Sequence, residues 1–128
     1  LSAPLDKIQI IKGWTENGKI NEVVYDVICS DDREINNRNN KCKETKASVN
    51  FENCSFDENY GSDRLEVIWT DTEYTPDQNT FYYARAIENP TCRWSTYDSI
   101  RIDEKPAKNY PKIMREMAWS SPIWVKNN

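Results

Sequence analysis

The sequence predicts a mainly β protein, an antiparallel β-sandwich of immunoglobulin-like architecture with one short C-terminal helix; a partly open β-barrel is the alternative. Three observations favour this fold class. Apolar and polar residues alternate in several short segments, an Asn-Gly pair joins two of them, and turn-forming residues recur about every ten positions. The 128 residues are expected to form a single domain, 1–128.

The first two segments are expected to form a β-hairpin. Residues 7–14 and residues 20–29 both alternate apolar and polar side chains, as strands with one covered face do. Asn17 and Gly18 lie between them, and both residue types tolerate the positive φ that a tight hairpin turn needs.

The middle of the chain is expected to contain a long loop and two short strands. Residues 31–46 should be a solvated polar loop, because Ile35 is the only sizeable apolar residue in them. Short strands are expected at 47–54 and 65–69, the second of which could instead form a helical turn. Pro76 opens a turn before the next element.

An aromatic strand beginning at Phe81 is the most distinctive element of the chain. Asn89 and Pro90 should end it, because proline has no backbone N–H to donate to a neighbouring strand. Residues 91–98 then combine a cysteine with large side chains, where an ordinary loop would be small and polar. We therefore expect this corner to be held rigidly.

The C-terminal region is expected to contain the short helix. Pro111 suits the first turn of a helix, and Pro122 would end it. Apolar residues recur at helical spacing between the two prolines: Ile113, Met114, Met117 and Ala118. Residues 123–125 should form a last extended segment.

Composition argues against two classes of partner. The net charge is −4, and acidic and basic residues are interspersed. Because no basic stripe is available to neutralise phosphates, nucleic acid is not an expected partner. No apolar run approaches the length needed to span a bilayer, so no membrane span is expected.

Four cysteines favour disulfides over a zinc site. Cys29, Cys42, Cys54 and Cys92 are spaced far more widely than paired zinc ligands, and the chain contains no histidine. Of the three possible connectivities, we favour Cys29–Cys42, which closes the polar segment, and Cys54–Cys92, which ties a strand end to the rigid corner. Such bonds imply an oxidising compartment, whereas four buried free thiols would fit a cytosolic protein.

The absence of histidine also bears on catalysis. Acid–base chemistry would depend on carboxylate pairs such as Asp71 and Glu73, and the polar loops that carry them do not position two carboxylates across a cleft. We therefore expect no catalytic residue, no cofactor and no metal site in this chain. A small carboxylate-dependent hydrolase is a weaker alternative.

The five tryptophans have two interpretations. At least three of them are expected in the core, because their neighbours are apolar or alternate in polarity. Trp94 and Trp124 lie in irregular segments and are the candidates for exposure. Exposed rings could stack on sugars, which would make the chain a carbohydrate-binding module.

Four segments carry a family resemblance. The chain resembles the C-terminal part of the bacterial family called domain of unknown function 3604 at KIQIIKGW (residues 7–14), VVYDVICSD (23–31), the aromatic region (67–98) and REMAWSSPIWV (115–125). Longer members of that family resemble PHP-type (polymerase and histidinol phosphatase) metal-dependent hydrolases, whose metal ligands lie upstream of this region. The resemblance therefore implies a non-catalytic accessory domain, a C-terminal fragment of a larger periplasmic or secreted hydrolase.

The same resemblance suggests where the chain would contact its catalytic domain. Its most specific segments include Arg93, Trp94, Tyr97, Pro122 and Trp124, which we expect to lie near one another or on a common face. A tryptophan would serve as an apolar anchor, and Arg93 could donate hydrogen bonds to the partner. Alternatively, both tryptophans are core residues and Arg93 caps the sheet.

Overall fold

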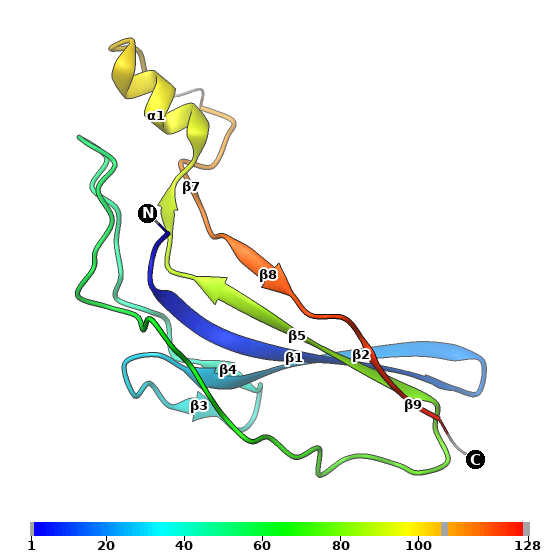
Figure 1. The fold of residues 1–128 in the computed structure, drawn as a ribbon. Helices are drawn as coiled ribbons and strands as arrows, with labels where there is room; N and C mark the ends of the chain where they lie inside the picture. The colour runs from blue at the N-terminus through cyan, green and yellow to red at the C-terminus, as the bar shows by residue number, and fades with distance from the viewer. Residues whose placement is uncertain (1, 106–107, 127–128) are drawn as a thin grey trace.

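The computed structural model describes residues 2–105 and 108–126 (Figure 1). The largest sheet in this part of the chain has five antiparallel strands: β1 (Leu5–Glu16), β2 (Lys19–Cys29), β5 (Thr80–Glu88), β8 (Met117–Trp119) and β9 (Ile123–Val125). Strand β1 pairs with β2 on one side and with β5 on the other. The short strands β8 and β9 both pair with β5, each along a different part of it.

Smaller elements extend this sheet at its ends. Strands β3 (Ile35–Asn36) and β4 (Lys41–Cys42) pair with each other, and β6 (Thr91–Cys92) pairs with β7 (Ile113–Met114). Helix α1 (Trp94–Arg101) follows β6. Figure 1 shows α1 beyond one end of the sheet, on the side of the N-terminus, and β9 at the opposite end.

The predicted hairpin is confirmed. Strands β1 and β2 are joined by Asn17 and Gly18, whose φ angles are 50° and 73°. The aromatic strand and the last extended segment are confirmed as β5 and β9.

The fold class is confirmed as mainly β, with antiparallel sheets and one short helix among the described residues. This arrangement is consistent with a sandwich-like fold. No sheet in the described ranges closes into a barrel.

The position predicted for the helix was wrong. Residues 113–114 and 117–119 form β7 and β8, while α1 lies where the sequence predicted an irregular corner. Short apolar runs suit either a helix or a strand, and the pairing of these residues with β6 and β5 decides for strands. The helix is held by tertiary contacts, since the buried Thr96 donates a hydrogen bond from Oγ1 to the Lys112 carbonyl oxygen at 2.8 Å.

The strands predicted at 47–54 and 65–69 were also wrong. Neither segment forms a strand in the structure, and an isolated bridge joins Val49 to Phe56. Figure 1 shows the second of these segments, in green, running beside the sheet. Side chains hold it there: the Trp69 ring lies 5.0 Å from that of Tyr25, between centroids. Such contacts fix a segment without the alternating ladder of a strand.

The polar segment 31–46 is mostly exposed, and it also carries structure that the sequence did not predict. It contains β3 and β4, and Arg33 turns back to pair with the buried Asp6. Arg115 pairs with the other carboxylate oxygen of Asp6, so one buried acid joins three distant parts of the chain.

Both favoured disulfides are present. Cys29–Cys42 and Cys54–Cys92 have Cα–Cα distances of 6.0 and 5.6 Å. The first ties β2 to β4, and the second ties the middle loop to β6, directly before α1.

The expectation that at least three tryptophans lie in the core was wrong. Trp94, Trp119 and Trp124 are 66%, 59% and 65% exposed, and the other two are half-buried. The exposed rings lie on α1 and on the short strands β8 and β9, and in the described part of the chain no second sheet lies over them. The core instead combines a few aliphatic residues, such as Ile11 and Ile87, with buried polar residues that are hydrogen-bonded.

Candidate functional site

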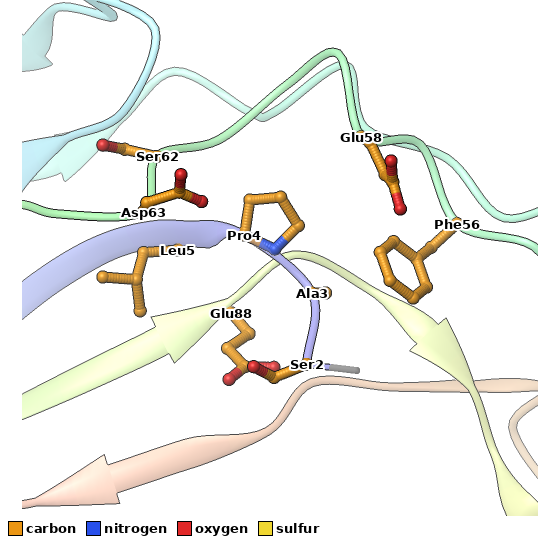
Figure 2. Close-up of a pocket in the computed structure, with 9 residues that line it drawn as sticks. All are labelled: Ser2, Ala3, Pro4, Leu5, Phe56, Glu58, Ser62, Asp63 and Glu88. Atoms are coloured by element: carbon orange, nitrogen blue, oxygen red, sulfur yellow. The ribbon is translucent and has the colours of Figure 1, made fainter.

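A surface hollow of about 520 Å³ lies beside the N-terminal segment (Figure 2). The segment from Ser2 to Leu5 crosses it, the loop 56–63 forms one rim, and Glu88 at the end of β5 lies on the other side. The hollow therefore lies where the sheet meets the middle loop.

Backbone contacts fix the rim of this hollow. Leu5 and Ser62 exchange two hydrogen bonds, of 2.9 and 3.0 Å. The buried Asn89 donates from Nδ2 to the Tyr60 carbonyl oxygen at 2.8 Å. Gly61 has a φ of 102°, and a Cβ there would lie 2.5 Å from the Pro4 Cβ, so this close approach requires glycine.

A second hollow of about 520 Å³ adjoins the first and shares Ser2, Ala3, Phe56 and Glu88 with it. It extends to Trp94, Tyr97, Met114 and Glu116. We call the two together the Glu88 hollow. The Cys54–Cys92 disulfide and a 3.5 Å hydrogen bond from Tyr97 Oη to the Cys54 carbonyl oxygen hold its rim against α1.

The Glu88 hollow is acidic. The described residues that line it include four acids, Glu58, Asp63, Glu88 and Glu116, and no lysine or arginine. Glu88 Oε2 is buried and has no hydrogen-bond partner within the described part of the chain. Leaving such an acceptor unpaired is costly, on the order of 1–3 kcal/mol. A hydrogen-bond donor from outside the domain would satisfy it.

The hollow also has an apolar side. Trp94 projects from α1 and is largely exposed, and Phe56 and Met114 line the same space. Acidic and apolar groups together suit the binding of a basic, partly apolar segment better than that of a small anion.

The structure places the five predicted interface residues in two groups. Arg93, Trp94 and Tyr97 lie at the α1 end of the sheet, whereas Pro122 and Trp124 lie at the β9 end, with the nine-residue strand β5 between them. It therefore does not bring the two groups together. The Arg93 guanidinium lies 5.5 Å from the centroid of the Tyr110 ring.

Sequence reasoning missed the acids of this site. Glu88 directly precedes the Asn89-Pro90 pair that ends β5, so its place at a sheet corner could have been found from that signal. Glu58 and Phe56 could not, because they lie between the two segments predicted as strands, 47–54 and 65–69, and no local pattern places them beside Glu88.

A different, more apolar hollow of about 420 Å³ lies on the sheet, lined by Ile10, Trp69, Tyr74, Tyr82 and Ile123 among others. Its acid, Asp71, is already occupied: Lys12 Nζ and Tyr82 Oη both lie 2.6 Å from its Oδ2. Burial alone would raise the pKa of Asp71, but the hydrogen bonds from Lys12 and Tyr82 outweigh it and hold that pKa below its usual value.

Tyr25 lies in the same polar cluster. Its Oη donates to Glu73 Oε2 at 2.9 Å. Burial, this hydrogen bond and the nearby carboxylates raise the pKa of Tyr25 to about 12. These groups therefore serve to attach the loop to the sheet, since they are paired with each other.

Residues 2–105 and 108–126 contain no group of three cysteine, aspartate or glutamate side chains that converge as metal ligands. The expectations of no catalytic residue and no cofactor remain predictions. No helix in these ranges is long and apolar enough to cross a bilayer.

Comparisons with known proteins identify a family. No curated protein and no solved structure matches the chain. The family model for a protein of unknown function, DUF3604, matches residues 1–127. Because that match covers nearly the whole sequence, the chain belongs to the DUF3604 family.

Proposed function

We propose that this chain is a non-catalytic accessory domain that packs against another folded part of a larger polypeptide through the Glu88 hollow. The observation that carries the proposal is the buried, unpaired Glu88 Oε2 in an acidic hollow beside the exposed Trp94. A donor from a docked partner would satisfy this oxygen, and leaving it buried and unpaired is destabilising.

The partner segment should be basic and partly apolar. A lysine or arginine would donate to Glu88 and neutralise part of the acidic lining, and charge-assisted hydrogen bonds of this kind are the strong ones. An apolar side chain next to it would bury Trp94, since exposed tryptophans often anchor interfaces. The fixed rim of the hollow favours docking without rearrangement.

The larger polypeptide, in this proposal, is a PHP-like metal-dependent hydrolase with this domain at its C-terminal end, and Glu88 and Trp94 contact its catalytic domain. The four resembling segments support the choice of parent. The two disulfides support a periplasmic or secreted location, because such bonds persist in oxidising compartments.

Hydrogen–deuterium exchange tests the docking. The polypeptide encoded by the complete reading frame and the 128-residue chain would be compared by mass spectrometry. We expect slower amide exchange at 56–63 and 88–97 in the longer polypeptide. Trp94→Ala should remove that protection, while the 128-residue chain with the same change stays folded because Trp94 is exposed.

Ile20→Ala serves as the matched control, because Ile20 is 84% exposed at the tip of the hairpin and far along the sheet from α1. It should leave the protection unchanged. Equal exchange of 88–97 in the two polypeptides, or a reading frame that encodes no further folded domain, would show the proposal to be wrong.

A further inference from the structure

Four aromatic side chains share one face of the five-stranded sheet. Phe81 and Tyr83 are two residues apart in β5, and Trp124 of β9 is directly opposite Phe81. Trp119 of β8 is opposite Arg85, which is the next residue of β5 on the same face. We call Phe81, Tyr83, Trp119 and Trp124 the aromatic row.

Three rings of this row, those of Phe81, Tyr83 and Trp124, lie next to one another. The Phe81 and Tyr83 planes are within 5° of parallel, with centroids 6.4 Å apart. The Trp124 ring is tilted by 45° to that of Phe81, and their centroids are 5.1 Å apart. Phe81 lies directly against Gly13 of β1, where a Cβ would come within 2.3 Å of the ring. The absence of a side chain at Gly13 thus lets the end of the Phe81 ring lie over β1.

One charged donor is fixed within the row. Arg85 donates from Nε and Nη2 to Gln9 Oε1 at 2.9 and 2.6 Å. Gln9 donates to Asp26 Oδ1 at 2.6 Å, and Asp26 Oδ2 accepts from Lys7 at 3.0 Å and from the Cys42 backbone N–H at 2.8 Å. This chain of bonds orients the guanidinium, and no described residue accepts a hydrogen bond from its Nη1.

We propose that the aromatic row binds a neutral polysaccharide chain. Sugar rings have an apolar C–H face, which stacks on aromatic rings, and an edge of hydroxyl groups, which needs fixed donors such as Arg85. A row that follows β5 suits an extended chain of such rings. The net charge of −4 disfavours a polyanion.

A protein partner fits the same surface less well. The core of a protein interface is depleted in charged residues, whereas this row holds the Arg85 guanidinium among its rings. The row runs from the β9 end of β5 as far as Arg85, whereas Trp94 follows β6 beyond the other end of β5 and is not part of the row, so the inference is independent of docking through the Glu88 hollow.

Affinity gel electrophoresis of the 128-residue chain tests this, with four probes cast in native gels: hydroxyethylcellulose, arabinoxylan, galactomannan and a soluble β-1,3-glucan. We expect at least one of them to retard the chain. Trp119→Ala and Trp124→Ala should each weaken binding about tenfold, since each removes an exposed stacking surface. Arg85→Met should weaken binding while leaving the rings in place.

Trp94→Ala is the control, because it removes an equally exposed tryptophan outside the row and should leave the retardation unchanged. No retardation by any of the four probes would overturn the proposal, as would retardation that survives loss of both Trp119 and Trp124. If instead these two changes alter only self-association or contact with the rest of the polypeptide, the face is a protein interface and the proposal is wrong.

Discussion

The two faces of the five-stranded sheet carry similar aromatic residues but bury them to different extents. On one face, Tyr25 and Tyr82 lie beneath the loop that carries Trp69, and ion pairs and hydrogen bonds to Asp71 and Glu73 attach that loop. On the other face, the aromatic row ends in two largely exposed tryptophans. Aromatic residues are therefore not buried simply because they lie on the sheet. On the first face they are covered because ion pairs and hydrogen bonds hold a loop over them.

Replacing Asp71 should detach the loop from the covered face, and we expect it to have the largest effect on stability. Lys12 and Asp71 form a 2.6 Å ion pair with side chains only 3% and 8% exposed. Asp71→Ala leaves a buried lysine without its partner, which should lower the free energy of unfolding by about 3–5 kcal/mol. Urea denaturation followed by tryptophan fluorescence measures this.

The exposed pair Lys43–Glu34 is the control, and Glu34→Ala should cost less than about 1 kcal/mol. Replacing both members of the buried pair, as Lys12→Met with Asp71→Leu, should recover part of the loss. Equal stabilities of Asp71→Ala and Glu34→Ala would mean that the loop is attached by other contacts.

The two disulfides should differ in the same assay. Cys54–Cys92 spans 38 residues and Cys29–Cys42 spans 13. In the chain-entropy model, replacing the cysteines by serine should cost about 4 and about 3 kcal/mol respectively. The reverse order would indicate that the β3–β4 hairpin beside Asp26 contributes more than its short closed loop implies.

The same substitution on the two faces sharpens the comparison directly. Trp69→Ala removes a half-buried ring packed on Tyr25 and should cost about 2 kcal/mol. Trp124→Ala removes a ring that is 65% exposed and should cost about 1 kcal/mol or less. Equal losses would show that the aromatic row is part of the core.

Low pH should lower the stability of the protein through one aspartate on each face of the sheet. The pKa of Asp71 and that of Asp26 are held below their usual values in the folded chain, because hydrogen bonds outweigh burial. Both carboxylates therefore contribute stability above the unfolded-state pKa of about 4, and that contribution is lost as the pH falls through their folded-state values. Thermal unfolding between pH 6 and about pH 2 checks this, with Asp71→Asn expected to flatten the curve.

High pH should also lower stability, through Tyr25 on the covered face, and we expect this effect to be the smallest. Burial and the bond to Glu73 raise the pKa of Tyr25 to about 12. Its contribution to stability is present below the unfolded pKa of about 10 and is lost as the pH rises toward 12. Tyr25→Phe should make stability less dependent on pH in this range.

Much of the fold could be predicted from local signals. Alternation and the Asn17-Gly18 turn predicted the hairpin, the aromatic run predicted β5, and the cysteine positions led to the pairing that the structure contains. Residues 47–54 alternate just as well and form no strand, because no neighbouring strand offers its backbone to them. The helix prediction failed for the opposite reason, since residues 113–114 and 117–119 do find partner strands, β6 and β5.

The candidate site was predicted only in part. Trp94 and Tyr97 were identified because residues 91–98 contain unusually many large side chains, and both line the Glu88 hollow. Glu58, Glu88 and Glu116 come together from three distant segments, and no local sequence pattern predicts that they line the same hollow. The aromatic row was likewise hidden, because it depends on which residues of β8 and β9 pair with β5.

By itself, the sequence determined the class of fold, the central hairpin and the aromatic strand, because these follow from periodicity and turn chemistry. It favoured the disulfide pairing that the structure contains but left three connectivities open. Only the tertiary structure decided where the helix lies, which aromatic rings are covered, and that Glu88 is left buried without a hydrogen-bond partner within the described residues. These outcomes depend on strand register and on contacts between residues far apart in the chain, and no local pattern encodes the free energy of such contacts.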